Sequence, residues 1–322
     1  MLDRRAFLTS LSFAVILIAR DSKAQADKVF RLGLLWLGPH PPEYHQGVLD
    51  ALRAFEYVEG KNLIAHYGFG GPDELVGLAS EMVRMKVDVI HAGSSAATRA
   101  AIGATRTIPI VAVDLETDPV ASGFASTLAR PGGNLTGFFL NLPEFTGKRL
   151  EILKEALPGI SHVAALWDSS MDRAPLIGID AAARRFNLRV SVIELASNSE
   201  LESAFSQAAR MKAGALIVMP SPRLDGYKST MIKLAATHRV PLVTLFAHFT
   251  ADGGLLSYGP NIQDLLDRSA TYIDKILKGT KPGDLPIQRP AKFDFVVNLK
   301  TANAFHLKVS DSVLARADKV IH

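Results

Sequence analysis

Serine residues stand at predicted strand ends in the first half of the chain, where they could hold a small polar ligand. The segment Gly93-Ser94-Ser95-Ala96 follows an apolar run that ends near His91 and opens an alanine-rich helical segment. A serine can cap the first turn of such a helix, and the backbone N–H groups at its positive end suit a carboxylate. Ser94 and Ser95 are therefore predicted to hold an anionic or zwitterionic solute, and a plain helix-capping role is an equal alternative.

Two aspartates could complete a clamp for an amino acid. Asp114 and Asp118 follow the fourth predicted strand, so a carboxylate there could receive a ligand ammonium group while the serines hold the ligand carboxylate. An aspartate before Pro119 is also ordinary turn chemistry. Both roles stay open for these aspartates, and the clamp is a hypothesis.

The second half of the chain repeats this placement of polar residues. Asp168-Ser169-Ser170 and Pro220-Ser221-Pro222 each follow an apolar run. Ligands of open α/β sheets bind beyond the carboxyl ends of the strands, so two facing lobes would bring two such edges to one cleft. Ser169 and Ser221 are predicted to contact the ligand from the second lobe.

Four aromatic residues near predicted strand ends or crossings could enclose an apolar or aromatic ligand group. They are Trp36, Trp167, Phe246 and Tyr258. The two tryptophans are the only ones in the chain, and they close similar apolar runs at 32–36 and 163–167, which indicates an internal structural repeat. A place in the core is the more common role of aromatic residues, so both interpretations stay open.

The amino terminus has the composition of an export signal. Arg4 and Arg5 precede an apolar run over residues 8–19, and Ala24-Gln25-Ala26 supplies small residues around a cleavage point. A helix of this length rises only about 18 Å, against a bilayer core of about 30 Å, so a stable membrane span is not expected. The paired arginines fit either the twin-arginine or the general export route. Cleavage is expected after about Ala26.

The elements that must position these residues alternate along the chain, which predicts βα units and mostly parallel sheets. Predicted strands cover 31–36, 62–67, 87–91, 108–113, 135–140, 162–167, 189–195, 215–219, 242–246, 255–258 and 292–297. Predicted helices cover 43–55, 73–85, 95–105, 144–157, 174–186, 199–211, 226–238 and 262–278. A length of 322 residues suits two α/β lobes, each Rossmann-like with a parallel sheet.

The expected domain organisation follows from these elements. Residues 1–26 are the export signal, lobe 1 combines 27–139 with 255–284, and lobe 2 combines 140–254 with 285–322. Three linkers, near 138–144, 247–254 and 284–291, would join the lobes. Such a hinge lets the lobes move as rigid bodies while a few linker residues absorb the rotation.

Composition and motifs argue against several classes of protein. Half of the formal net charge of +4 lies in the first 26 residues, and the other basic residues are spread along the chain, so a nucleic-acid partner is not expected. Cysteine is absent, which excludes disulfides, thiolate metal sites and a lipid-bearing cysteine. The chain lacks H-E-x-x-H, G-x-S-x-G and a phosphate loop ending in G-K-[ST]. No enzymatic activity, cofactor or metal is therefore expected.

Four motifs in order resemble a known family. They are PGGNLTG at 131–137, GKRLEILK at 147–154, GLLSYGP at 254–260 and KFDFVVNLKTA at 292–302. Together they resemble the ABC-transporter substrate-binding family related to tryptophan-binding transport proteins, over about residues 30–307. The final helix departs from the family, because Ala304-Phe305-His306-Leu307 is bulkier than the usual Ala-Leu-Gly-Leu. We expect this difference to affect packing rather than the ligand.

The resemblance implies a type I periplasmic-binding fold and a role, but not the identity of the solute. The implied protein is a monomer, free in the periplasm without a lipid anchor, that captures a small solute and presents it to an ABC permease in the inner membrane. The strand-end serines and aspartates favour an amino acid or a similar small carboxylate. A periplasmic ligand-sensing subunit for a membrane receptor is the alternative, and an exported α/β enzyme is a weaker one.

Overall fold

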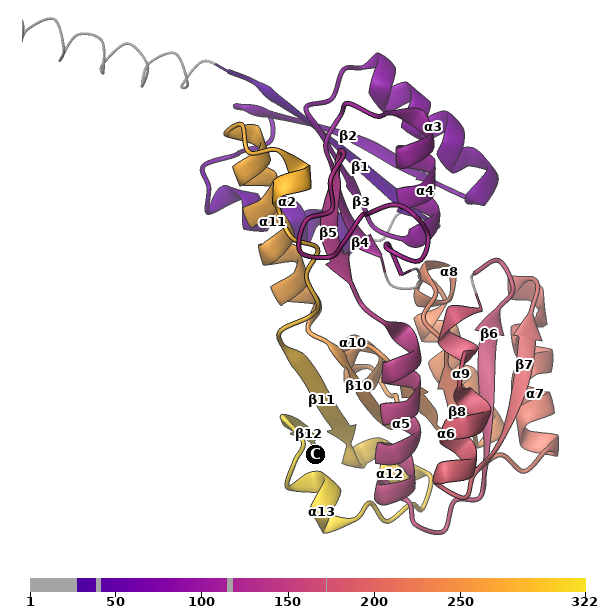
Figure 1. The fold of residues 1–322 in the computed structure, drawn as a ribbon. Coiled ribbons are helices and arrows are strands. Elements are labelled where there is room, and N and C mark those ends of the chain that lie inside the picture. Colours follow the sequence, from indigo (N-terminus) through magenta and orange to yellow (C-terminus); the bar gives the residue numbers. More distant parts are fainter. Residues whose placement is uncertain (1–27, 39–41, 115–117, 172) are drawn as a thin grey trace, which may run out of the picture.

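The computed structural model describes residues 28–38, 42–114, 118–171 and 173–322. Figure 1 shows two lobes, one above the other, each built on its own twisted sheet. The predicted export signal, residues 1–26, lies outside the described residues. Within the described ranges, no helix combines the length and the apolar composition that a membrane crossing requires. The predicted fold class, two α/β lobes, is confirmed.

The first lobe contains a five-stranded sheet in the order β2-β1-β3-β4-β5, with every pair parallel. Its strands are β1 (Phe30–Leu37), β2 (Leu63–Gly70), β3 (Val89–Ala92), β4 (Ile110–Asp114) and β5 (Leu135–Phe139). The helices between them are α2 (Pro42–Arg53), α3 (Pro72–Arg84) and α4 (Ser95–Ala104). The inner strands are buried on both faces, which is why they read as continuous apolar runs.

The second lobe contains a seven-stranded sheet in the order β12-β11-β10-β9-β8-β6-β7. Its strands are β6 (His162–Asp168), β7 (Arg189–Leu195), β8 (Leu216–Val218), β9 (Leu242–Thr244), β10 (Leu256–Pro260), β11 (Phe293–Asn298) and β12 (Lys319–Ile321). Its helices are α5 (Leu142–Ala156), α6 (Ile179–Arg185), α7 (Leu201–Arg210), α8 (Pro222–Asp225), α9 (Lys228–His238), α10 (Ala247–Ala251), α12 (Leu299–Ala304) and α13 (Asp311–Leu314). Short 3₁₀ turns of this lobe are η1 (Ala174–Leu176) and η2 (Asn198–Glu200), whereas η3 (Pro282–Asp284) lies beside β5 in the first lobe. Strands β10 and β11 are antiparallel, so this sheet is mixed, which agrees with the prediction of mostly parallel sheets.

The structure corrects the expected lobe division at residues 255–260. These residues were expected in lobe 1, but β10 pairs with β9 and β11 and therefore belongs to the second sheet. The chain returns to the first lobe only with α11 (Ile262–Leu277), which lies beside α2 in Figure 1. The second crossing is thus at 260–262 rather than at 247–254, where α10 belongs to lobe 2. We propose 28–139 with 262–284 as lobe 1 and 140–260 with 285–322 as lobe 2.

Helices cover both faces of each sheet. In the first lobe, α2 and α11 pack on one face, and α3 and α4 pack on the other. In the second lobe, α5, α6 and α12 cover one face, and α7 and α9 cover the other. A further apolar cluster joins the lobes at the hinge and includes Val113, Phe138, Leu245, Phe246 and Leu265.

The two lobes repeat one arrangement of strands. Strand β1 lies between β2 and β3, and β6 lies between β7 and β8, with all four pairings parallel. Trp36 and Trp167 stand next to the last residue of β1 and β6, respectively. This arrangement agrees with the internal repeat predicted from the two tryptophan-ended runs.

Candidate functional site

A small cavity lies between the two lobes, beyond the carboxyl ends of their strands. Its volume is about 50 Å³. Three kinds of segment line it: strand ends of the first lobe, strand-end loops of the second lobe, and the start of α11. The described lining residues are Trp36, Gly93, Val113, Ser221, Pro222, Asp225, Phe246, Ile262, Leu265 and Leu266. This is the position predicted for a ligand between two facing α/β sheets.

The lobes touch each other beside this cavity. Gly38, directly after β1, approaches the start of α8 so closely that a Cβ on it would lie 3.6 Å from the backbone carbonyl carbon of Pro222. Pockets for small ligands usually have volumes of about 300–1,000 Å³, whereas 50 Å³ holds only a few water molecules. The lobes must therefore move apart before a solute as large as an amino acid can enter.

Most of the cavity wall is apolar. Trp36, Phe246 and Leu266 reach it from three different segments, and all three are buried. The indole ring of Trp36 covers Gly93 and also packs against the ring of His91, with 5.6 Å between the ring centroids. Such aromatic and aliphatic walls suit an apolar or aromatic ligand group.

Asp225 is the one charged residue among the described residues that line the cavity. It ends α8, its side chain is 15% exposed, and its Oδ1 accepts a hydrogen bond of 2.6 Å from Nε2 of His248. A carboxylate in a largely apolar site attracts a cation more strongly than one in water does. Asp225 can therefore bind an ammonium group.

The amino terminus of α4 begins next to the cavity. Gly93 lines the cavity, and Ser94 is the N-cap of α4, where its Oγ accepts a hydrogen bond of 3.1 Å from the backbone N–H of Ala97. The helix-capping role that the sequence left open is thus present for Ser94. Ser95 is buried at the first turn of the same helix. The positive end of this helix faces the region of Gly93, where a ligand carboxylate would be stabilised.

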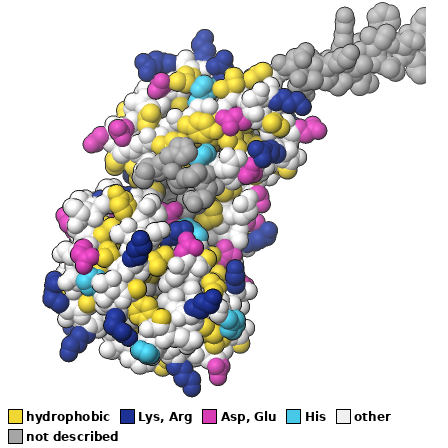
Figure 2. Space-filling model, turned by 180° about the vertical axis from the view of Figure 1, so that it is seen from behind, with side chains coloured by type: hydrophobic (Ala, Val, Ile, Leu, Met, Phe, Trp, Pro, Cys, Tyr) yellow, Lys and Arg dark blue, Asp and Glu magenta, His cyan; other side chains and the backbone are white. Residues whose placement is uncertain are grey.

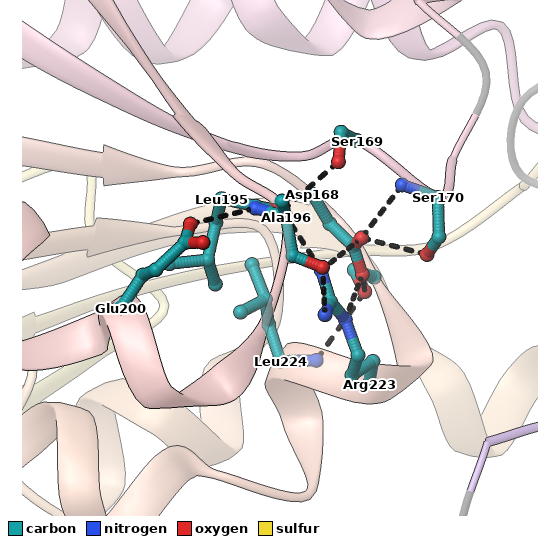
Figure 3. Close-up of polar contacts among 9 residues, drawn as sticks. Asp168, Ser169, Ser170, Leu195, Ala196, Glu200, Arg223 and Leu224 are labelled. Carbon is teal, nitrogen blue, oxygen red and sulfur yellow. Dashed lines mark hydrogen bonds and ion pairs between the residues drawn. The ribbon is translucent and has the colours of Figure 1, made fainter.

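A buried network around Asp168 shapes the edge of the second lobe at the cavity (Figure 3). Asp168 ends β6, is fully buried, and accepts hydrogen bonds from Ser221 Oγ at 2.5 Å and from Ser170 Oγ at 2.6 Å. Arg223 pairs with both carboxylate oxygens and also donates to the carbonyl oxygens of Leu195 and Ala196, at 2.9 and 3.0 Å. The network ties the ends of β6 and β7 to the start of α8, so it fixes Ser221 in the cavity wall.

The pKa of Asp168 reflects two opposing effects. Burial by itself raises the pKa of this carboxyl group, because it disfavours the charged form. Hydrogen bonds from Arg223, Ser170 and Ser221 stabilise the carboxylate and outweigh burial, so the pKa lies below its ordinary value of 3.8. Asp168 is therefore a permanent anion at neutral pH, fully occupied by protein partners.

The structure describes the side chain of only one of the two predicted clamp aspartates, and it lies away from the cavity. Asp118 lies in an exposed turn, where its Oδ1 accepts hydrogen bonds from the backbone N–H groups of Val120 and Ala121 at 2.9 and 3.1 Å. Asp118 therefore has the turn-forming role that the sequence left open beside a ligand-binding role. Asp114 ends β4, and its side chain lies outside the described part of the structure. The acid that the described cavity wall does contain is Asp225, from the second lobe.

Of the ten predicted ligand residues, Trp36, Ser221 and Phe246 line the cavity. Trp167 packs in the core of the second lobe, with the guanidinium of Arg173 4.6 Å above its ring. Ser169 donates a hydrogen bond of 3.2 Å to the carbonyl oxygen of Leu195.

Tyr258 stands apart from the cavity. It stacks on Phe293 at 6.1 Å and lines a separate groove of about 800 Å³ along α5.

Sequence reasoning missed several residues of the cavity. Asp225 ends the segment that begins with Ser221, so its proximity to that serine was an available signal. Ile262, Leu265 and Leu266 come from α11, whose return to the first lobe carries no local signal because it depends on packing against α2.

Two α/β lobes that are joined by three crossings and enclose a cavity at their strand ends define a solute-binding protein of the two-lobed class. The chain belongs to the family described as ABC transporter substrate binding protein, whose model matches residues 38–321. Members of this non-enzymatic family bind small molecules outside the cytoplasm and work with a membrane permease. The function class expected from the sequence is therefore confirmed.

Three similar proteins illustrate the range of the family. A tyrosine-binding protein of Clostridioides difficile is 25% identical over 89% of this chain and 84% of its own length. A conserved domain protein of Vibrio cholerae is 26% identical, with a TM-score of 0.82 over 91% of this chain and all of the other. An ABC domain from Streptococcus pneumoniae, solved in complex with L-Trp, is 23% identical, with a TM-score of 0.82 over the same shares.

Proposed function

We propose that the chain is a periplasmic binding protein that captures an α-amino acid with an apolar or aromatic side chain and presents it to an ABC permease. It catalyses no reaction. The predicted leader, residues 1–26, directs export and is removed after about Ala26, and the mature protein acts as a monomer without a lipid anchor.

The placement of one acid in a largely apolar cavity carries this proposal. Asp225 receives the ligand ammonium group, and Trp36 and Phe246 pack against the ligand side chain. The ligand carboxylate binds near Gly93, at the positive end of α4. The three groups of an amino acid thus each have a partner of fitting chemistry, and the partners come from both lobes.

The similar proteins support an aromatic amino acid in particular. One of them is a tyrosine-binding protein, and another was solved with L-Trp. Closure around such a ligand follows a population shift, because the ligand stabilises the closed form by contacting both lobes. Affinity in the micromolar range or tighter corresponds to about 8 kcal/mol or more.

Calorimetric titration with matched analogues tests the proposal. A thermal-shift screen of L-phenylalanine, L-tyrosine, L-tryptophan and L-leucine, with sugars and nucleosides, first identifies the class. L-Phenylalanine is then compared with 3-phenylpropionate, which lacks the ammonium group, and with phenethylamine, which lacks the carboxylate. We expect both analogues to bind at least about tenfold more weakly than the amino acid, since each loses one charged partner.

Two variants assign the ammonium site. Asp225→Asn should weaken L-phenylalanine binding about tenfold or more and leave 3-phenylpropionate unchanged. Asp118→Asn is the matched control, because Asp118 lies in an exposed turn and its amide oxygen can keep the turn hydrogen bonds. Stabilisation by sugars or nucleosides alone, or an Asp225→Asn protein that binds the amino acid normally, contradicts the proposal.

A further inference from the structure

Met171 of the second lobe lies in the core of the first lobe. It follows β6 by three residues and is only 6% exposed. The apolar cluster that buries it consists otherwise of first-lobe residues between 35 and 135, among them Leu37, Leu75 and Ala97. A second-lobe residue can be buried in this cluster only while the lobes are in contact.

The network around Asp168 holds the turn that presents Met171. The backbone N–H of Met171 donates to the carbonyl oxygen of Asp168 at 3.0 Å, and the Asp168 carboxylate accepts from the backbone N–H of Ser170 at 2.9 Å. Arg223 and Ser221 donate to the same carboxylate, and Figure 3 shows Arg223 beside it. The turn at 168–171 therefore has its shape set from within the second lobe, independently of the first.

A second contact between the lobes adjoins the same network. Gly38 of the first lobe meets Pro222 and Arg223 of α8, and Arg223 is the partner of Asp168. One rigid element, the Asp168 network with the start of α8, therefore holds three features of the closed form. They are the cavity wall at Ser221, the contact at Gly38 and the turn that carries Met171. Because packed cores favour discrete arrangements over intermediate ones, such an element biases the lobes toward full closure.

We propose that Met171 is a latch residue that enters the first lobe on closure, and that Asp168, with Arg223 and Ser221, is the positioning group that holds it ready. The inference rests on the proposed function, because closure serves the capture of a solute. A methionine suits this role, since its flexible thioether adapts to an apolar socket that it enters and leaves repeatedly. The latch stabilises the closed form without touching the ligand, so it raises affinity for every solute alike.

Pulsed electron spin resonance on the purified protein measures the closure directly. The chain has no native cysteine, so Glu81→Cys on α3 and Ser203→Cys on α7 label one exposed position in each lobe. In the absence of any solute, the parent protein should show a population at short distance. Met171→Ala should lower the ratio of closed to open molecules about tenfold or more, the effect expected from removing a buried methionine side chain. Met171→Leu should restore it.

Two further variants separate the latch from general effects. Ile177→Ala removes an apolar side chain of the same lobe that is 65% exposed, so it should leave the distances unchanged. Asp168→Asn should reduce closure as Met171→Ala does. Circular dichroism and thermal melting identify any variant whose lobes fail to fold. If Asp168→Asn fails to fold, the comparison of Met171→Ala with Met171→Leu decides whether the latch exists.

Oxidation by dilute hydrogen peroxide gives a second readout on the unmodified protein. Met171 should react more slowly when the lobes close, whereas the buried Met231 should stay protected and the half-buried Met211 should react at a constant rate. A parent protein with no short-distance population, or the same distance distribution in Met171→Ala, overturns the inference. Both results are independent of amino-acid binding, so a failure of the proposed ligand class leaves this test intact.

Discussion

Trp36 leaves no room for a side chain on Gly93. A Cβ atom at this position would lie 2.5 Å from Cε2 of the indole and closer still to two other ring carbons, below the 3.0 Å that real contacts respect. The indole also packs against the ring of His91. Gly93 therefore fixes how far the Trp36 ring extends into the cavity between the lobes.

Gly93→Ala should displace the Trp36 ring and disturb the cavity. We expect a loss of about 1–3 kcal/mol in the free energy of unfolding, as for other overpacked sites, together with weaker solute binding. Urea denaturation and calorimetry measure the two effects. Gly103→Ala is the control, because nothing lies within 4 Å of a Cβ there and alanine favours the helix by about 0.5–1 kcal/mol. Equal effects of the two substitutions would show that Trp36 does not confine Gly93.

His91 should make the protein sensitive to mild acid. Burial lowers the pKa of His91 to about 4, and both ring nitrogens lack a hydrogen-bond partner among the described residues. Between pH 6.5 and 4 the unfolded chain therefore binds more protons at this site than the folded chain does. The free energy of unfolding should fall across this window as the pH decreases, by up to about 3 kcal/mol.

His91→Leu tests this origin of the pH dependence. The variant should lose the part of the slope between pH 6.5 and 4 that belongs to this site, as measured by urea denaturation at several pH values. His322→Gln, at an exposed position, should keep the slope of the parent protein. A His91→Leu protein with an unchanged slope would place the acid sensitivity elsewhere.

Asp168 and Arg223 should be strongly coupled. Removing the carboxylate in Asp168→Asn leaves Arg223, 19% exposed, without its anion, which we expect to cost about 2–4 kcal/mol. Arg223→Gln should cost a similar amount, and the double variant should cost less than the sum of the two. Because the folded pKa of Asp168 is lowered, the pair stabilises the protein above about pH 3.8, and this contribution is lost as the pH falls further. Additive single effects would contradict the coupling.

The sequence predicts features that depend on local burial, and it misses features that depend on contacts between distant segments. Apolar periodicity identified the longer helices and every described strand except β12, because it reports which face of each element is buried. It missed the short helices α8, α10, α12 and α13. It could not assign β10 to a sheet, since the same apolar run suits the edge of either lobe. Trp36 and Trp167 end similar runs, yet only Trp36 lines the cavity, while Arg173 covers Trp167. Asp225 lines the cavity because the two lobes lie against each other there, and no local sequence pattern predicts such a contact between lobes.

Arg149 is buried without an acidic partner among the described residues. Its guanidinium donates to the carbonyl oxygen of Val218 at 3.0 Å and to Thr146 Oγ1 at 3.3 Å, and burial lowers its pKa to about 9. The charge is costly here, so the alkyl stem supplies the stabilising packing. Arg149→Met should stay within about 1 kcal/mol of the parent protein, whereas Arg149→Ala should lose about 3 kcal/mol through a cavity. Denaturant titration compares the two, and an equal loss in both would assign the stabilisation to the charge.

Charges of both signs are mixed on one face of the molecule. On the face seen in Figure 2, Lys and Arg side chains are interspersed with Asp and Glu over both lobes, and no continuous basic stripe runs across it. A nucleic-acid site would gather basic side chains on one surface. The described residues on this face form no such site.

Fluorescence of single-tryptophan variants tests most directly whether a solute binds between the lobes. Trp167→Phe leaves Trp36 as the sole reporter at the cavity, and Trp36→Phe leaves Trp167 in the core as the control. Titration with L-phenylalanine, which does not absorb at the excitation wavelength of tryptophan, should give a saturable change in Trp36 emission and little change in Trp167 emission. A Trp36 signal that stays constant while calorimetry detects binding, or a response confined to Trp167, would contradict capture at this cavity.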